Sequence, residues 1–376
     1  MTLFALEQWR REARQPEIQA DRCRASAALF DFSFMSVVRL SGPDAASAIS
    51  RYVRRDISQM RPGSIRYCLR SDPSGPVLSD LTVWRVNDQT FDVMSGERRD
   101  AKHLLEQANL KTTVENLSER TAIFSVQGPM SLAQVLPACE GDRLKDLGYF
   151  CFDDLDIHGV SARIGRLGYT GERGFEIVVD AAYAKSLWAS LSEHIEVAGF
   201  AVADILRIEA GFALFCNEFT IGATVKELAM DWFVDSTLDA SIVSRSLVCF
   251  TATADERPVL WQRPQDAASA PEPGELLATS ACFSPLAGSV LGLGYVVTQD
   301  KSGASPLIDP LGNFDQIRLQ QRPFFDPKKR VVLGGWDGHF HPLSATLFPS
   351  VRYANSLKSR PGRPQADPYR PIRQCF

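Results

Sequence analysis

Hydrophobic and polar residues alternate irregularly along the first 235 residues, and this pattern predicts a mixture of helices and strands. Apolar residues at helical spacing predict amphipathic helices over 44–53, 97–110 and 183–197, and Asp44 is expected to cap the first of them. Runs rich in Val, Ile, Phe and Thr predict strands at 37–42, 76–86, 121–128, 159–167 and 175–180. Because the two kinds of element alternate irregularly, we expect an α+β fold and not a doubly wound sheet.

The pattern changes after about residue 240, where short apolar runs are separated by turns. Such a pattern is typical of a small all-β domain, either a barrel or a sandwich. From residue 334 onward Pro, Arg, Ser and Gly dominate, and apolar residues are too few for a separate core. We therefore predict an α+β region over 1–238, a β-barrel domain over 239–333 and a Pro/Arg-rich tail over 334–376.

Charge and composition narrow the classes of partner. The 376 residues include 41 Lys and Arg against 45 Asp and Glu, so no overall field attracts nucleic acid or an anionic membrane. No segment has the length and apolarity of a signal peptide or a membrane span, and we expect a cytoplasmic protein that binds small molecules. The absence of a G-x-G-x-x-G or Walker motif argues against dinucleotide or ATP binding.

Cysteines and histidines do not form a recognisable metal site. The eight cysteines include no C-x-x-C pair, which favours reduced thiols over a zinc site or a set of disulfides. Among the five histidines only His339 and His341 are close in sequence, and two ligands do not complete a zinc site. We expect no metal cofactor.

The segment 167–180, LGYTGERGFEIVVD, places one carboxylate in a half-apolar strand. Strand alternation puts Phe175 and Ile177 on one face and Glu176 on the other. A carboxylate among apolar neighbours needs a partner, because burial of an unpaired charge is costly. It either pairs with a nearby arginine or binds a planar pair of donors on a ligand, such as the amino group and ring N–H of a pterin. The candidate arginines are Arg163, Arg166 and Arg173.

Two further residues have both a structural and a functional interpretation. Asp80 interrupts the apolar run SGPVLSDLTVWRV, either as an edge acid that caps the turn or stays in solvent, or as a desolvated carboxylate. A desolvated carboxylate would stabilise a developing iminium cation or position an attacking amine. Tyr169 either fills the core of a hairpin or offers its ring or hydroxyl to a ligand, with the glycines of GYTGERG admitting that ligand close to the backbone.

Six segments in series resemble the aminomethyltransferase family, which includes the glycine-cleavage T-protein, tetrahydrofolate-dependent demethylases and the folate domains of dimethylglycine and sarcosine oxidases. They are 30–45, 74–83, 121–129, 167–177, 204–219 and 281–296. The resemblance covers roughly residues 25 to 330 in the same order, and its most specific block is G-Y-T-G-E-x-G-F-E. It implies folate-binding α+β domains followed by a small β-barrel, and a tetrahydrofolate-dependent one-carbon transferase.

The resemblance also implies roles for individual residues. Asp80 matches the second acid of the family's G-G-x-x-D-D-L, the catalytic aspartate. Glu176 and Tyr169 match the glutamate and tyrosine that contact the pterin. Three further matches imply contacts to tetrahydrofolate within its cleft or at the wall that closes it, namely Tyr67, Met35 and Trp232.

Several positions depart from the family's pattern, and they cluster around the one-carbon donor and the folate tail. The donor is therefore expected to differ from the lipoyl-bound aminomethyl group of glycine cleavage. We expect a small methyl or aminomethyl donor, and Asp80 favours an amine-linked carbon. The departing residues are Phe34, Ser79, Ser95, Ala203, Cys216 and Val225.

Two other functions remain open at this point. One is a folate-binding protein without activity, akin to the family's iron-sulfur repair factors, although their K-G-C-[FY]-x-G-[QE] motif is replaced here by FTIGATVKEL. The other is a subunit of a larger oxidase or demethylase complex. In that case a protein partner would cover the N-terminal side of the cleft, because the segment before Arg22 is shorter than in the family.

Overall fold

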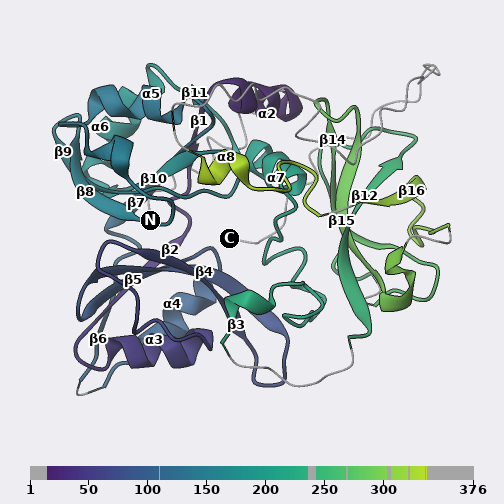
Figure 1. Cartoon of the computed structure of the whole chain (residues 1–376), viewed down its shortest axis with the longest axis horizontal. Coiled ribbons are helices and arrows are strands. Elements are labelled where there is room, and N and C mark those ends of the chain that lie inside the picture. Colours follow the sequence, from purple (N-terminus) through teal and green to yellow (C-terminus); the bar gives the residue numbers. More distant parts are fainter. Residues whose placement is uncertain are drawn as a thin grey trace.

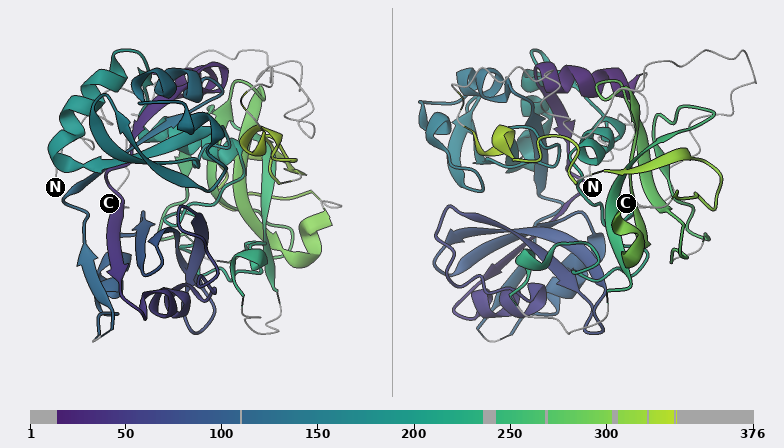
Figure 2. Two further views of the ribbon diagram at one scale, coloured as in Figure 1. Left: turned by 60° about the vertical axis from the view of Figure 1, so that its left-hand side comes forward. Right: turned by 45° about the vertical axis from the view of Figure 1, so that its right-hand side comes forward.

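Three β-sheets lie around a common centre (Figure 1). The structure is a computed structural model, and it describes residues 15–109, 111–235, 243–267, 270–302, 306–320, 322–334 and 336. Helices cover the first two sheets, and Figure 2 shows that the third sheet lies beside them and is not stacked on either. The α+β class expected from the sequence is confirmed.

The first sheet has six strands in the order β11-β1-β7-β10-β9-β8. All neighbours are antiparallel except β1 and β11. Helix α6 (Ala181–Ser192) begins where the Asp180 side chain accepts a hydrogen bond from the Ala182 amide, and it packs against β7 and β10. The strands are β1 (Ala28–Asp31), β7 (Thr121–Gln127), β8 (Phe152–Ile157), β9 (Val160–Gly165), β10 (Gly174–Asp180) and β11 (Glu196–Val197).

The second sheet has five strands in the order β3-β4-β5-β2-β6, and it is inserted in the sequence between β1 and β7. Helices α3 (Ala45–Val53) and α4 (Arg98–Leu105) pack on one face, around buried side chains such as Val38, Leu81 and Val83. The strands are β2 (Ser36–Ser41), β3 (Ile65–Ser71), β4 (Val77–Asn87), β5 (Thr90–Ser95) and β6 (Thr113–Asn116).

The predicted cap of α3 is wrong. Asp44 precedes the helix, but its side chain accepts no capping hydrogen bond. The reason is its backbone, with φ −98° and ψ 2°, because an N-cap side chain reaches the helix amides from an extended conformation. Helix α4 instead has Glu97 as its cap, and it is shorter than predicted. Position 110, at the end of the predicted helix, lies outside the described residues.

The third sheet is antiparallel, in the order β13-β14-β15-β12-β16. Its edge strands β13 and β16 are not hydrogen-bonded to each other in the part of the chain that the structure describes, so closure into a barrel stays a prediction. The strands are β12 (Arg245–Thr253), β13 (Trp261–Gln262), β14 (Leu277–Ser284), β15 (Ser289–Val297) and β16 (Asp315–Gln320).

Two helices join these sheets, and neither was predicted from the sequence. Helix α7 (Phe200–Glu209) is buried over most of its length because it packs on both α2 and the third sheet. Helix α2 (Pro16–Ala25) packs along α7. After β16 the chain crosses back past α7 to the short helix α8 (Arg330–Leu333), which lies near the first sheet (Figure 1). Beyond Leu333, only Gly334 and Trp336 of the predicted tail are described.

The described ranges contain neither a membrane-spanning helix nor a metal-binding cluster. None of the helices there is both long and apolar enough to cross a bilayer. No group of three or more His, Cys, Asp or Glu side chains in those ranges is arranged to hold a metal ion. His339 and His341 lie outside the described residues.

Candidate functional site

Asp80 and Glu176 lie on strands of two different sheets that face each other. On β4 the side chains of Asp80 and Trp84 project to the same face, toward the first sheet. A Cβ atom at Gly165 of β9 would collide with the Trp84 indole, and Gly165 is the cross-strand partner of Glu176. Four residues along a strand span about 13 Å, so Asp80 lies about that far along β4 from the contact that brings Trp84 to the Glu176–Gly165 pair, and both carboxylates are on the facing sides of the two sheets.

Glu176 is a buried carboxylate without a partner. The residue is 6% exposed, and its carboxylate forms no hydrogen bond or ion pair with any described residue. Burial alone raises the pKa of Glu176 from 4.5 to about 7. The faces of β10 are as predicted, because Phe175 and Ile177 belong to the core under α6 while Val178 packs with Glu176 toward the centre.

The three arginines that were candidates to pair with Glu176 are engaged elsewhere. Arg163 is held in two ion pairs, and Arg166 and Arg173 donate to backbone carbonyls. The ion-pair interpretation of Glu176 is therefore wrong. The partners and distances are Asp92 (2.7 Å) and Asp154 (2.8 Å) for Arg163, Leu147 O (3.0 Å) and Gly334 O (2.6 Å) for Arg166, and Val331 O (2.9 Å) for Arg173.

Asp80 is partly buried, and its carboxylate accepts a hydrogen bond from the Tyr67 hydroxyl at 3.1 Å. Desolvation raises the pKa of Asp80 to about 6, although the Tyr67 hydrogen bond opposes that rise. The turn before β4 is capped by Asp72, which accepts from the Ser74 amide, so Asp80 is not the turn cap. Asp80 is thus an anion at neutral pH in a largely desolvated position.

Tyr169, Tyr67 and Asp80 interact electrostatically, because the Asp80 charge adds to the burial-raised pKa of each tyrosine. Burial raises the pKa of Tyr169 well above its usual value, and the Asp80 charge adds to that rise. The Tyr169 hydroxyl donates to the Ala213 carbonyl at 2.6 Å, so this hydroxyl is already hydrogen-bonded to the backbone. The ring, with Phe212 at a centroid distance of 6.0 Å, remains as a surface for a flat ligand.

The other two predicted site residues are placed differently. Met35 is partly buried at the edge of the central core. Trp232 is 76% exposed, and the structure does not bring it to the other site residues. Its neighbour Phe233 packs instead against Tyr67, with ring centroids 4.9 Å apart. Sequence reasoning missed Phe233, because adjacent residues of the short turn 231–233 point in different directions and the sequence does not say which one faces inward.

The glycines of GYTGERG make room for a side chain of the protein. A Cβ atom at Gly168 or Gly174 would overlap with the Gln127 side chain. Gln127 donates to the Leu167 carbonyl at 3.0 Å and accepts from the Thr170 hydroxyl at 2.9 Å. These bonds fix the turn that leads into β10 and thereby position Glu176. The expected approach of a ligand to these glycines is replaced by the approach of Gln127.

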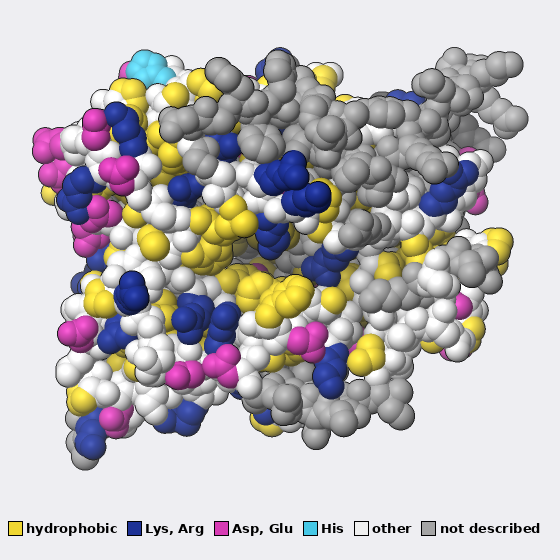
Figure 3. Space-filling model, viewed as in Figure 1, with side chains coloured by type: hydrophobic (Ala, Val, Ile, Leu, Met, Phe, Trp, Pro, Cys, Tyr) yellow, Lys and Arg dark blue, Asp and Glu magenta, His cyan; other side chains and the backbone are white. Residues whose placement is uncertain are grey.

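Apolar side chains surround this region. The face in Figure 3 is hollowed near its centre, and hydrophobic side chains ring the hollow with cationic ones beside it. Two desolvated carboxylates of raised pKa beside apolar side chains suit a flat heterocycle with N–H donors and a cationic reaction centre. The partly buried side chains on the central core include Phe34, Met35, Tyr67, Phe215, Ile221 and Phe233.

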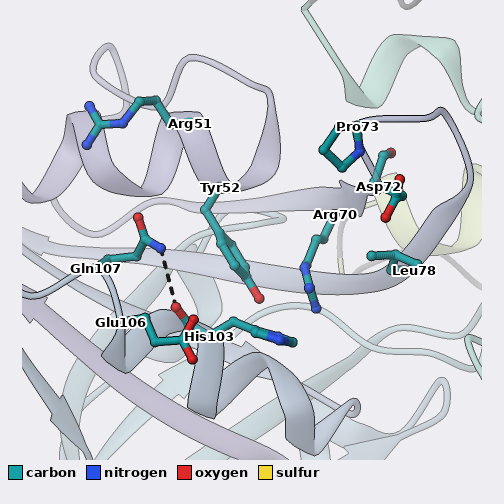
Figure 4. A pocket seen from close by; sticks show the side chains of 10 residues that line it. Arg51, Tyr52, Arg70, Asp72, Pro73, Leu78, His103, Glu106 and Gln107 are labelled. Atoms are coloured by element: carbon teal, nitrogen blue, oxygen red, sulfur yellow. Dashed lines mark hydrogen bonds between the residues drawn. The ribbon is translucent and has the colours of Figure 1, made fainter.

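Two other hollows lie away from these residues. One, of about 340 Å³, is bordered by α3, α4 and β3, and its lining includes Tyr52, Arg70 and His103 (Figure 4). The other, of about 400 Å³, lies between the first two sheets and contains the Arg39–Asp92–Arg163 ion pairs. Neither is lined by any of the six residues that the sequence assigned to the site.

Comparison with known proteins gives one consistent result. The family model described as the GCVT N-terminal domain matches residues 4–237. The probable aminomethyltransferase of Natronomonas pharaonis is 30% identical over 81% of this chain and 89% of that protein. The aminomethyltransferase of Rubrobacter xylanophilus is 29% identical over 88% of this chain and 92% of its own length.

A solved structure shows the same fold. The crystal structure of glycine cleavage system aminomethyltransferase T from Bartonella henselae superposes with a TM-score of 0.67, at 23% identity over 82% of this chain and 89% of that one. The resemblance found in the sequence is confirmed by the family match and by these relatives. The chain therefore belongs to the aminomethyltransferase family that carries the GCVT N-terminal domain.

Proposed function

We propose that this protein is a tetrahydrofolate-dependent one-carbon transferase that moves a methyl or methylene group from a small, amine-linked donor to tetrahydrofolate. The observation that carries the proposal is the Glu176 carboxylate, which is buried between two sheets without a partner. Family membership supports it, because the relatives named above are aminomethyltransferases.

The residues present fit a reduced pterin. Glu176 would accept two parallel hydrogen bonds from the pterin amino group and ring N–H, which relieves the cost of its burial. Tyr169 would offer its ring, while Tyr67 and Met35 would form the wall of the cleft. When bound, tetrahydrofolate supplies the nucleophilic nitrogen that accepts the carbon. The resemblance assigns Trp232 to this cleft, but we propose that Phe233, packed on Tyr67, takes that place.

Asp80 would act on the reaction centre. With a pKa of about 6 it is ionised at neutral pH, and its surroundings are largely apolar. A carboxylate fixed by the Tyr67 hydroxyl stabilises positive charge that develops between carbon and nitrogen, and it does so more strongly than in water. Holding both reactants in this cleft supplies a further part of the rate by orientation.

Paired variants test the two roles. Glu176→Gln is expected to weaken tetrahydrofolate binding, measured by calorimetry, by about tenfold or more, because one acceptor becomes a donor. Asp80→Asn is expected to lower turnover by roughly 100-fold while changing folate affinity far less. Glu115→Gln, at an exposed carboxylate on β6, is the control and leaves both unchanged.

The outcomes separate the candidate functions. Equal losses of turnover and binding in Asp80→Asn would overturn its assigned role. Tight folate binding without turnover on any N-methyl, O-methyl or S-methyl donor would favour a folate-binding protein without activity. Turnover that appears only after addition of a second protein would favour a subunit of a larger complex.

A further inference from the structure

Arg322 is a partly buried cation near the centre of the molecule. It follows β16, in the segment that crosses past α7 (Figure 1). Its Nε donates to the Gly211 carbonyl at 2.8 Å, and its Nη1 donates to the Leu228 carbonyl at 2.7 Å. Nη2 donates to no described residue, and no described carboxylate pairs with this guanidinium.

This arrangement differs from that of the other arginines buried around the centre. Arg24 pairs with two glutamates, Arg207 pairs with Asp204 and Glu218, and Arg245 pairs with Glu227. Two carbonyls orient the Arg322 guanidinium but do not neutralise its charge. Partial burial of a charge without a counterion costs free energy, and an anionic ligand would reduce that cost.

Arg322 also lies beside the proposed site. The carbonyl it binds, that of Gly211, is two residues from the carbonyl that holds the Tyr169 hydroxyl, that of Ala213. Two extended residues span about 7 Å, so the guanidinium and Tyr169 approach the same short segment. Burial and the Asp80 charge raise the pKa of Tyr67, whose hydroxyl is bonded to Asp80, well above its usual value, and the Arg322 charge opposes that rise.

We infer that Arg322 binds a carboxylate group of the ligand that occupies the cleft. This inference rests on the proposed function, because it concerns the ligands of the same site. A planar guanidinium with a free Nη2 matches a carboxylate in both geometry and charge. Two sources have this chemistry: the glutamate of tetrahydrofolate, and the acid group of an N-methylated amino acid acting as donor.

Binding measurements on the full chain separate these sources. Wild type, Arg322→Gln and Arg322→Lys are titrated with tetrahydrofolate and with tetrahydropteroate, which lacks the glutamate. The same proteins, saturated with tetrahydropteroate, are then titrated with N,N-dimethylglycine and with trimethylamine. We expect Arg322→Gln to weaken binding of one carboxylate-bearing ligand at least tenfold, and to change binding of its carboxylate-free counterpart by less than about twofold. Arg322→Lys should recover part of the loss, since it keeps the charge but not the planar donors.

Other results would overturn the inference. Equal losses for ligands with and without a carboxylate, or no loss for either, would mean that Arg322 only supports the fold. Arg245→Gln is the matched control. The charges of Arg245 and Arg322 both oppose the burial-raised pKa of Tyr295 on β15, but Arg245 is already paired with Glu227. It should leave the preference for carboxylates unchanged. If wild-type protein binds neither tetrahydrofolate nor tetrahydropteroate, the proposed function itself is contradicted, and the inference with it. Thermal unfolding of each variant shows whether a loss of affinity reflects loss of the fold.

Discussion

A single acid in a strand was the most informative residue of the sequence, and the structure explains why. Strand alternation alone predicted that Glu176 and Phe175 face opposite sides. What the sequence could not decide was whether an arginine neutralises the acid, because Arg163, Arg166 and Arg173 are all near it in sequence. Only the three-dimensional arrangement shows that Asp92, Asp154 and several backbone carbonyls occupy those arginines.

The raised pKa of Glu176 predicts a proton release on folate binding. At neutral pH about half of the empty sites carry a proton, because the pKa is about 7. In the proposed complex, two hydrogen bonds from the pterin would favour the carboxylate and lower its pKa, so the bound protein would lose that proton. Calorimetry in buffers of different ionisation enthalpy should therefore detect about half a proton released near pH 7, rising toward one near pH 6. Glu176→Gln should abolish the difference between buffers.

The same group predicts how stability varies with pH. The pKa of Glu176 in the folded protein, about 7, lies above its usual value of 4.5. Its contribution to the free energy of unfolding is therefore fully present below about pH 4.5 and is lost as pH rises through 7. Glu176→Gln removes this loss. Measured by urea unfolding, the free energy of unfolding of the variant should exceed that of wild type by roughly 2 to 3 kcal/mol near pH 8, and this difference should vanish near pH 4. A gap independent of pH would contradict a buried, unpaired Glu176.

At the scale of elements, the predictable parts were those with one apolar face. The strand-like runs became β2, β4, β7, β9 and β10 with shifts of one or two residues. Helix α7 was missed because it is buried on nearly all sides, so its sequence lacks an amphipathic pattern. Helix α2 was missed because its main buried group is a charged residue, Arg24, whose partners are distant in sequence.

Arg24 predicts how α2 is held. It is fully buried, pairs with Glu172 and Glu209 at 2.7 Å each, and lies over the Phe325 ring. Arg24→Met would leave two buried carboxylates unpaired and should lower the free energy of unfolding by about 3 to 5 kcal/mol. Urea denaturation measures this loss. The matched control is Arg22→Met on the same helix, where the exposed pair with Glu196 is worth less than about 1 kcal/mol.

At the scale of the whole molecule, the chain repeatedly returns to the first sheet. It leaves after β1 to build the second sheet, returns at β7, and returns again from the third sheet through α8. The proposed site depends on this path, because Glu176, Asp80 and Arg322 come from segments that the three sheets position separately. The sequence offered candidates for two of them, but no local pattern shows that Arg322 and Tyr169 bond to carbonyls of the same short segment.

The segment through α8, by which the chain returns to the first sheet, is predicted to contribute to the free energy of unfolding. Val331 of α8 is buried, and Trp336 stacks on Phe175 with ring centroids 5.2 Å apart. Val331→Ala and Trp336→Ala should each lower the free energy of unfolding by roughly 1 to 3 kcal/mol. Leu333→Ala in the same helix is the control, since Leu333 is 62% exposed and should change it by less than about 0.5 kcal/mol. Three equal effects would mean that this segment does not dock as described.

The unpaired carboxylate on β10 also has a consequence for the protein in its host. If the protein binds tetrahydrofolate as proposed, that ligand stabilises the folded state, by an amount that grows with its concentration over its dissociation constant. Proteases act on the fraction that is unfolded at any moment. We therefore expect the amount of this protein to fall under folate starvation without any change in its messenger RNA, and Glu176→Gln to weaken that dependence.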